Sequence, residues 1–485
     1  MVEDVAWEGP KWLYAFLLGV CALLVYGQSV LASKSKPTEK YFWHYPPAFV
    51  EFQRRFLGVF FLFTLTEGLQ TVYREALYEH YGFGRRDIGI FVVTVHVSAL
   101  IIGTFLGAAA DCIGRRKASI ICGLLQLVGC LVRYSQNFYL LCVANVCHGL
   151  AISLFPTVLE AWLNSEHERL GFRQEWLCRT FWVMALGTGT AAIGVGAFAN
   201  LIVDRFGLGL VSPTFVAAAI AGLCILLVLN GWVENVGTQQ PKLSVSLFNA
   251  CQALKDKRIL LLGWIQTTFD VTFAAFQFLW TPTLIADGRD IHSGMIYAYL
   301  MASLMLGSAV AAFLLCGPYT TRPENFLPHV FVVASLALLV PAYDHQEIGV
   351  LVTVFCIYHV CVGIAWPSLA YLRSIYISND RRAGVLSFYR VPVHLGMLFI
   401  LIKGGILKHV ENSSVFYLCI LGLLSGCVAL HSLDKYRHQT SVGVKLQLEC
   451  KHQSPIVATE QRELHIDTVK KSGKLGEAHG EEGFS

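Results

Sequence analysis

Charged residues are scarce in this chain of 485 residues: Asp, Glu, Lys and Arg make up 14%, whereas hydrophobic residues make up 55%. Soluble globular domains carry about 25% charged residues. The composition therefore excludes an ordinary soluble protein and predicts an integral membrane protein in a lipid bilayer. The net charge of +4 follows from basic loops, so it implies no nucleic-acid partner.

The cysteines and histidines lack the spacings of disulfide frameworks and metal sites. The fifteen cysteines include no Cys-x-x-Cys pair, and the sixteen histidines include no His-x-x-His or His-x-x-x-His cluster. We interpret the cysteines as small packing residues that form neither a disulfide framework nor a metal site. We expect no cofactor, and an enzyme is the least favoured class because no nucleophile–base constellation is present.

Long apolar runs occupy most of the chain instead. Thirteen runs with few charges have the length of transmembrane helices, about 18 to 25 residues. They cover approximately residues 12–32, 56–80, 88–110, 118–136, 138–160, 180–203, 211–231, 259–285, 293–316, 326–342, 347–372, 383–407 and 414–433. The first run is preceded by acidic residues and followed by lysines, which is the reverse of a signal peptide. The pattern predicts an all-α polytopic membrane protein.

The loop charges predict its orientation. One set of alternate loops contains nineteen Lys and Arg residues before the tail is counted, and the opposite set contains eight. The positive-inside rule then places the N-terminus outside and the polar tail, residues 434–485, in the cytosol, where we expect it to be disordered. The single Asn-x-Ser/Thr sequon, at Asn412, falls in the last external loop and is a candidate glycosylation site. The plasma membrane is the default location.

Two halves of the chain repeat each other. Glu67 lies twelve residues after Arg55, and Asp270 lies twelve residues after Arg258. At about 1.5 Å per helical residue, both carboxylates fall near the bilayer midplane. Ionisable groups at that depth are costly and usually face a cavity or a partner. We therefore expect Glu67 and Asp270 to bind substrate or carry a coupling proton, with a structural charge pair as the alternative.

A loop between two apolar runs carries a recognisable pattern. Gly107 is followed by Asp111 and then by Gly114-Arg115-Arg116-Lys117. The loop resembles the signature loop of major facilitator superfamily transporters. That resemblance implies a major facilitator fold of two pseudo-symmetric six-helix bundles, here with one extra N-terminal transmembrane helix. The expected parts are the extra helix and linker (1–55), the first bundle (56–231), a cytosolic linker (232–258), the second bundle (259–433) and the tail (434–485).

Several further motifs narrow the resemblance. Between residues 12 and 433 the chain contains Glu160-Ala161-Trp162, Gln174-Glu175-Trp176, Gln266-Thr267-Thr268-Phe269-Asp270 and Phe388-Tyr389-Arg390-Val391-Pro392. Together these are similar to the molybdate-anion transporter family. The resemblance implies a secondary active transporter of a small inorganic oxyanion, most simply molybdate, that works by alternating access.

The chain departs from that family at two basic positions. The family pattern has an arginine where this chain has Asn145, and a basic residue where it has Val183. Arg390 remains at membrane depth, and its planar fork suits a tetrahedral dianion. We expect Arg390 to contact the anion, with a buried salt bridge to Glu67 or Asp270 as the alternative. Gln266, Trp280 and Asn145 are further candidates for lining the substrate site.

Other residues are candidates for a conformational latch. We expect Asp111, Arg115, Arg116 and Glu160 to form it, with Glu160 paired to Arg115 or Arg116 at the cytoplasmic end of its helix. Two alternatives to oxyanion transport remain. The substrate could be another small organic or polar anion, or the chain could be a transporter-like sensor that moves nothing.

Overall fold

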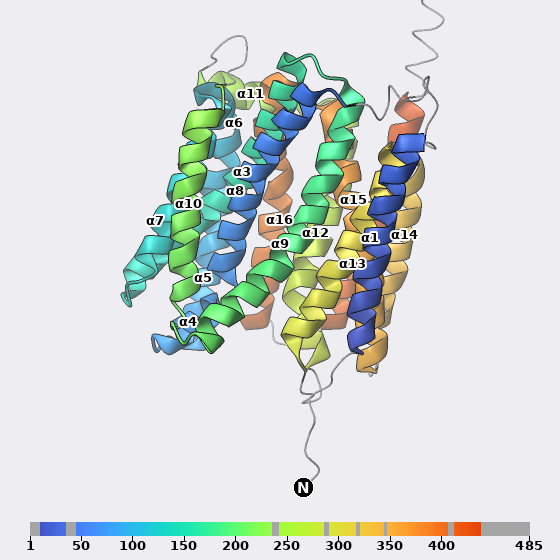
Figure 1. The fold of residues 1–485 in the computed structure, drawn as a ribbon. Helices are drawn as coiled ribbons and strands as arrows, with labels where there is room; N and C mark the ends of the chain where they lie inside the picture. Colours follow the sequence, from blue (N-terminus) through green and yellow to red (C-terminus); the bar gives the residue numbers. More distant parts are fainter. Residues whose placement is uncertain are drawn as a thin grey trace, which may run out of the picture. The chain divides into compact units, whose positions relative to one another are not determined.

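The computed structural model describes residues 10–34, 45–234, 242–285, 291–316, 321–343, 347–405 and 412–437. Its regular elements within these ranges are helices (Figure 1). The chain divides into two units, residues 1–431 and residues 432–485.

The first unit contains long helices joined by short turns. In the N-terminal part they are α1 (Lys11–Lys34), α3 (Pro47–Thr71), α4 (Arg74–His80), α5 (Arg85–Ser98), α6 (Thr104–Ile113), α7 (Arg115–Val132), α8 (Phe138–Arg169), α9 (Leu177–Asn200) and α10 (Ser212–Gly231). The C-terminal part contains α11 (Leu243–Ala253), α12 (Lys257–Leu284), α13 (Ser293–Cys316), α14 (Pro323–Ala342), α15 (Ile348–Tyr376), α16 (Arg382–Gly405) and a last helix that begins at Asn412.

These helices match the expected spans closely. In the described residues, eleven helices are long and apolar enough to cross a membrane. The other two expected spans are α1 and α7; α7 begins with Arg115, Arg116 and Lys117, which lower its hydropathy. A π-helical turn at Ala99–Gly103 joins α5 and α6 into one continuous helix. Helix α11, within the segment expected only to link the halves, was not foreseen.

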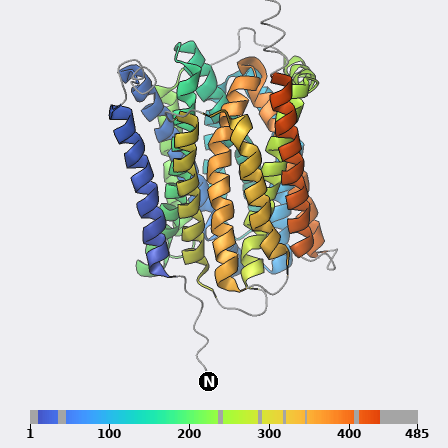
Figure 2. The ribbon, with the colours of Figure 1, turned by 90° about the vertical axis from the view of Figure 1, so that its right-hand side faces the viewer.

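The helices from α3 to α10 form one set, and those from α12 to the last helix form the other. Helix packing brings the two sets together. In Figure 1, α7 and α10 lie on the left, α13 and α14 on the right, and α9 runs between them to reach α13. Helix α16 packs against α6, α8 and α12, so it also contacts both sets. The additional helix α1 packs against α13, and Figure 2 shows it at the margin of the helical bundle.

The close approach of α6 and α16 depends on Gly107. A Cβ atom at this position would lie 2.2 Å from the carbonyl oxygen of Ala383 and would clash with Ser387. Gly107 therefore lets the two helices come close. At Gly114 the backbone has a φ of 104°, a conformation that favours glycine, and this turn separates α6 from α7.

Candidate functional site

A cavity of about 440 Å³ lies between the two sets of helices. Its lining comes from α3, α8 and α9 on one side and from α12, α15 and α16 on the other. Pro156 and Pro367, each within a long helix, both line it. The carboxylate and guanidinium side chains in this lining belong to Glu67, Glu160, Asp270, Arg373 and Arg390. A small polar solute in this cavity would therefore meet groups of both charges.

The structure brings some of the predicted substrate-site residues together and separates others. Glu67, Asp270, Gln266 and Arg390 all line the cavity, from three different helices. Asn145 and Trp280 are not among the residues that line it, and a role for either in substrate binding stays a prediction. Asn145 is buried and donates to the Tyr78 hydroxyl at 2.9 Å. Trp280 is buried and stacks on Tyr297.

A chain of charged and polar groups on α12, α15 and α16 meets Glu160 of α8, on the other side of the cavity. Arg373 donates to both carboxylate oxygens of Glu160, from Nε at 2.9 Å and from Nη2 at 2.5 Å. Its third nitrogen donates to the side-chain oxygen of Gln266. Gln266 is followed one helical turn further along α12 by Asp270, which also lines the cavity. The chain continues electrostatically from Asp270 to Arg390.

Arg390 differs from Arg373 in having few direct partners. Among the described residues it makes no salt bridge within 4.0 Å, and its buried Nε has no hydrogen-bond partner. Its nearest charged neighbours are Asp270, which attracts it, and Arg373, which repels it. The alternative of a direct salt bridge to Glu67 or Asp270 is therefore not what the structure shows. A guanidinium held in this way can offer paired donors to an anion.

The opposite wall has a different arrangement around Glu67. One carboxylate oxygen lies 3.5 Å from Nε2 of His148, and the other is buried without a hydrogen-bond partner. Arg74 and Arg133 interact electrostatically with this carboxylate but do not line the cavity. Arg133 is fully buried and donates to Gln70 instead. On this wall the acid faces the cavity and the arginines lie behind it.

The predicted latch residues lie at one end of the bundle. Asp111 accepts from Arg115 at 3.1 Å and from the backbone N–H of Gly384 on α16 at 2.9 Å. Arg115 also donates to the backbone oxygen of Asn379, just before α16. These contacts join the two sets of helices. We call this end, which carries the turns at 114, 171 and 379, the arginine-rich end; it is at the top of Figure 1.

The predicted roles of Glu160 and Arg116 need correction. Glu160 pairs with Arg373, not with Arg115 or Arg116, because the Arg373 side chain reaches from α15 to its carboxylate on α8. Arg116 donates to the backbone oxygen of Leu229 at 2.6 Å, and its backbone N–H meets Glu234. Arg116 therefore ties α7 to the end of α10 within one set of helices.

Two contributions were missed by sequence reasoning. Arg373 was counted as a loop residue because the apolar run ends at 372, but α15 continues to Tyr376. A disulfide joins Cys178 to Cys316, so the interpretation of every cysteine as a packing residue is wrong. The two cysteines are 138 residues apart, and no local spacing could indicate their pairing. In the part of the chain that the structure describes, no three His, Cys, Asp or Glu side chains are grouped to hold a metal.

Solved structures of two transporters share this fold. The E. coli fucose:proton symporter aligns with a TM-score of 0.62 at 13% identity, covering 79% of this chain and 98% of its own. A bacterial homologue of the iron transporter ferroportin, in an outward-facing state, also gives 0.62 at 13%, covering 79% and 99%. The chain therefore has a major facilitator fold of two pseudo-symmetric six-helix bundles with an extra N-terminal helix.

Sequence comparisons then identify the family. A family profile described as "Sugar-tranasporters, 12 TM" matches residues 13–356. The molybdate-anion transporter of Xenopus laevis is 31% identical over 87% of this chain and 94% of that protein. The corresponding protein of Danio rerio is 29% identical over 72% and 78%. This chain belongs to the molybdate-anion transporter family of the major facilitator superfamily, whose members are multi-pass membrane transporters and not enzymes.

Proposed function

We propose that this protein is a secondary active transporter of a small tetrahedral oxyanion, most simply molybdate, and that the anion binds at Arg390. The observation that carries the proposal is the state of this arginine: it lines the cavity without a salt bridge in the described residues, and its Nε is unpartnered. A guanidinium retains its charge when desolvated and binds oxyanions through two parallel hydrogen bonds. The relatives named molybdate-anion transporters support the choice of anion.

Arg373 contributes to the same wall in a secondary way. Its three donor nitrogens are engaged by Glu160 and Gln266, so it adds positive potential but offers few free donors. Asp270 balances part of this charge. An incoming dianion would displace Asp270 as the electrostatic partner of Arg390. Binding would thus exchange one buried charge interaction for another and would avoid a large desolvation penalty.

Glu67 is the better candidate for a coupling proton. It faces the cavity from the opposite wall, and one of its oxygens has no partner. A dianion bound at Arg390 would be repelled by an ionised Glu67 across the cavity. Anion binding therefore favours protonation of Glu67, and protonation favours anion binding by the same free energy. This reciprocity would couple anion uptake to a proton gradient.

Alternating access would require the arginine-rich end to open. Contacts between the halves close that end: Asp111 with Gly384, Glu160 with Arg373, and Gln174 with Ser374. The loop charges place this end in the cytosol. We therefore propose that the structure represents a state closed to the cytosol, in a plasma-membrane protein with an external N-terminus. The bundles are proposed at residues 56–231 and 259–433, with the tail from 434.

The direct test is flux of labelled molybdate into proteoliposomes that contain the purified protein. We expect concentrative uptake driven by an inward proton gradient and inhibited by excess unlabelled molybdate. Sulfate, a small carboxylate and a neutral hexose serve as competitors, the last because of the family description. Stronger inhibition by the carboxylate or the hexose than by unlabelled molybdate would identify that compound, and not molybdate, as the better substrate. Binding without flux would identify a sensor and contradict transport.

A further inference from the structure

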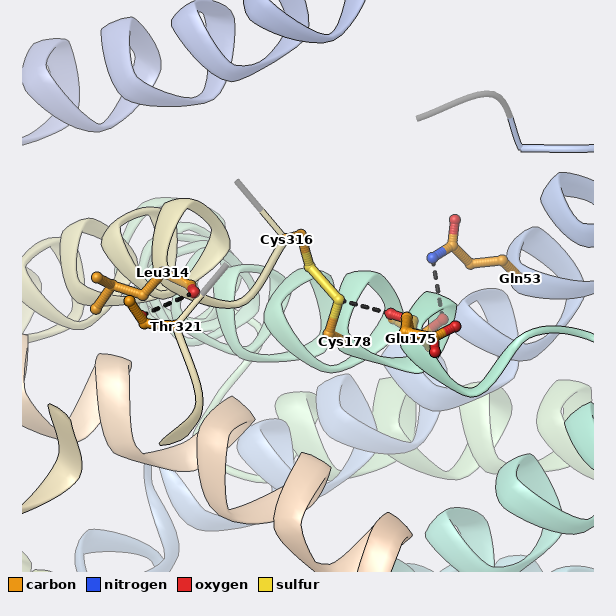
Figure 3. The surroundings of a disulfide bond; sticks show 7 residues. Gln53, Glu175, Cys178, Leu314, Cys316 and Thr321 are labelled. Atoms are coloured by element: carbon orange, nitrogen blue, oxygen red, sulfur yellow. Dashed lines mark hydrogen bonds between the residues drawn. A yellow bond between two sulfur atoms is a disulfide. The ribbon is translucent and has the colours of Figure 1, made fainter. Parts of the chain in front are cut away.

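Cys178 and Cys316 connect the two halves of the transporter covalently. Cys178 lies at the start of α9, in the first half, and Cys316 is the last residue of α13, in the second (Figure 3). Neighbouring contacts also cross between the halves: Ser308 of α13 donates to the backbone oxygen of Trp182 on α9 at 2.7 Å. The bond lies near Gln174, which contacts Ser374 at the arginine-rich end.

The surroundings of the two sulfur atoms suit a dithiol as well as a disulfide. Both cysteines are buried in an apolar cluster with Ala311, Leu315 and Ile364. The Cys178 sulfur is also 2.8 Å from the backbone oxygen of Glu175, an acceptor for a thiol proton (Figure 3). In the orientation proposed above, this end faces the cytosol, where glutathione keeps thiols reduced. The pair would then be a dithiol at rest.

We propose that Cys178 and Cys316 form an oxidisable thiol pair that arrests transport when a peroxide converts it to a disulfide. The two thiols lose two protons and two electrons, an S–S bond forms, and the O–O bond of hydrogen peroxide is broken to give two waters. Reduction by a dithiol reverses the step. Arrest on oxidation rests on the proposed function; formation of the bond does not.

The mechanical argument follows from the reach of a disulfide. The Cα atoms of Cys178 and Cys316 are 6.5 Å apart, and bonded cysteines rarely exceed about 7 Å. Opening the arginine-rich end requires α9 and α13 to separate there, because each belongs to a different half. An oxidised pair therefore holds this end closed, while a reduced pair leaves it free to open. The oxidised protein should bind solute from the opposite end of the bundle but should not release it at the arginine-rich end.

Bond formation can be tested without any substrate. A protease site is inserted between Glu234 and Lys242, so that cleavage separates Cys178 from Cys316 along the chain. After peroxide treatment, alkylation of remaining thiols and cleavage, we expect one band on a non-reducing denaturing gel and two bands after dithiothreitol. Cys178→Ser should always give two bands, whereas Cys251→Ser, which removes an exposed cysteine on α11, should behave like the parent. Two bands from the oxidised parent, or one band from untreated cells, would overturn the proposal.

Arrest is tested on the same purified protein in proteoliposomes. Peroxide should abolish molybdate uptake by the parent and by Cys251→Ser, dithiothreitol should restore it, and Cys178→Ser and Cys316→Ser should be insensitive. Full-rate uptake by cross-linked protein would contradict the proposal.

A second readout does not depend on the substrate: a soluble maleimide should label Ser374→Cys in reduced protein and not in oxidised protein, as located by peptide mass spectrometry. Equal labelling in both would also refute arrest, and absent molybdate flux in reduced protein would refute only the proposed function.

Discussion

The two walls of the cavity differ in which charged groups face it. On the wall formed by α12, α15 and α16, Arg373 and Arg390 face the cavity together with Asp270. On the wall formed by α3 and α8, Glu67 faces the cavity, and its arginines, Arg74 and Arg133, lie outside the lining. The comparison teaches that equivalent positions in two repeated halves can have different surroundings. In the proposed function, one wall holds the anion and the other presents an acid to it.

The largest expected effect comes from removing the paired donors of Arg390. Arg390→Lys keeps the charge but loses the planar fork, so molybdate binding should weaken. Losing a desolvated charged contact altogether costs about 2–5 kcal/mol, or about 30- to 5000-fold in affinity, which is the upper limit for Arg390→Lys. Molybdate titrations of purified protein measure it, with Arg86→Lys, at an exposed position outside the cavity, as the matched control. Equal affinity of Arg390→Lys and the control for molybdate would show that the anion is not held by the paired donors of Arg390. The proposed difference between the two walls would then be wrong.

The next effect concerns the ion pair that joins the walls. Glu160 and Arg373 are both nearly buried, so Glu160→Gln should leave an uncompensated charge and reduce the free energy of unfolding by about 3–5 kcal/mol. The double variant Glu160→Gln with Arg373→Gln should recover much of that loss, because both charges are gone. Thermal or denaturant unfolding of the purified proteins measures both. Additive losses in the double variant would show that the pair contributes no coupling between the halves.

A smaller effect separates the two acids by pH. If Glu67 binds the coupling proton, uptake should rise as the external pH falls, and Glu67→Gln should remove this dependence while exchange of bound solute partly persists. Asp270→Asn should retain the pH dependence, since its partners are the cavity arginines. Uptake and exchange across an acid-to-neutral pH series test both variants. If uptake by Asp270→Asn no longer depended on pH while uptake by Glu67→Gln kept its normal pH dependence, the coupling proton would be assigned to Asp270 and not to Glu67.

The smallest effect on transport is expected at Asn412, which is exposed at the start of the last helix. Asn412→Gln should remove any glycan and leave molybdate uptake unchanged, because the site is remote from both walls. The gel mobility of the protein from cells, before and after glycosidase, measures this. An N-terminal tag should be reached by antibody on unpermeabilised cells. A tag reached only after permeabilisation in a surface-expressed protein would contradict the orientation.

Much of the fold and part of the cavity could be predicted from the sequence. Glu67, Asp270 and Arg390 were identified because charges within apolar runs are expensive and therefore conspicuous. Asn145 and Trp280 lie outside the cavity lining, and a helix of low amphipathicity gives little indication of which face is toward the cavity and which is toward a neighbouring helix. The partner of Glu160 and the Cys178–Cys316 pair depend on helix packing between residues far apart in the chain. No pattern of neighbouring residues in the sequence indicates such contacts.

The central claim, that the anion is held on the Arg390 wall and not on the Glu67 wall, can be tested by one paired measurement. Equilibrium binding of molybdate is measured on purified, folded Arg390→Gln and Glu67→Gln proteins beside the parent. We predict that Arg390→Gln loses about 30-fold or more in affinity, whereas Glu67→Gln binds as tightly as the parent or more tightly, because a repelling charge is removed. Near-normal affinity in Arg390→Gln together with lost affinity in Glu67→Gln would contradict the account.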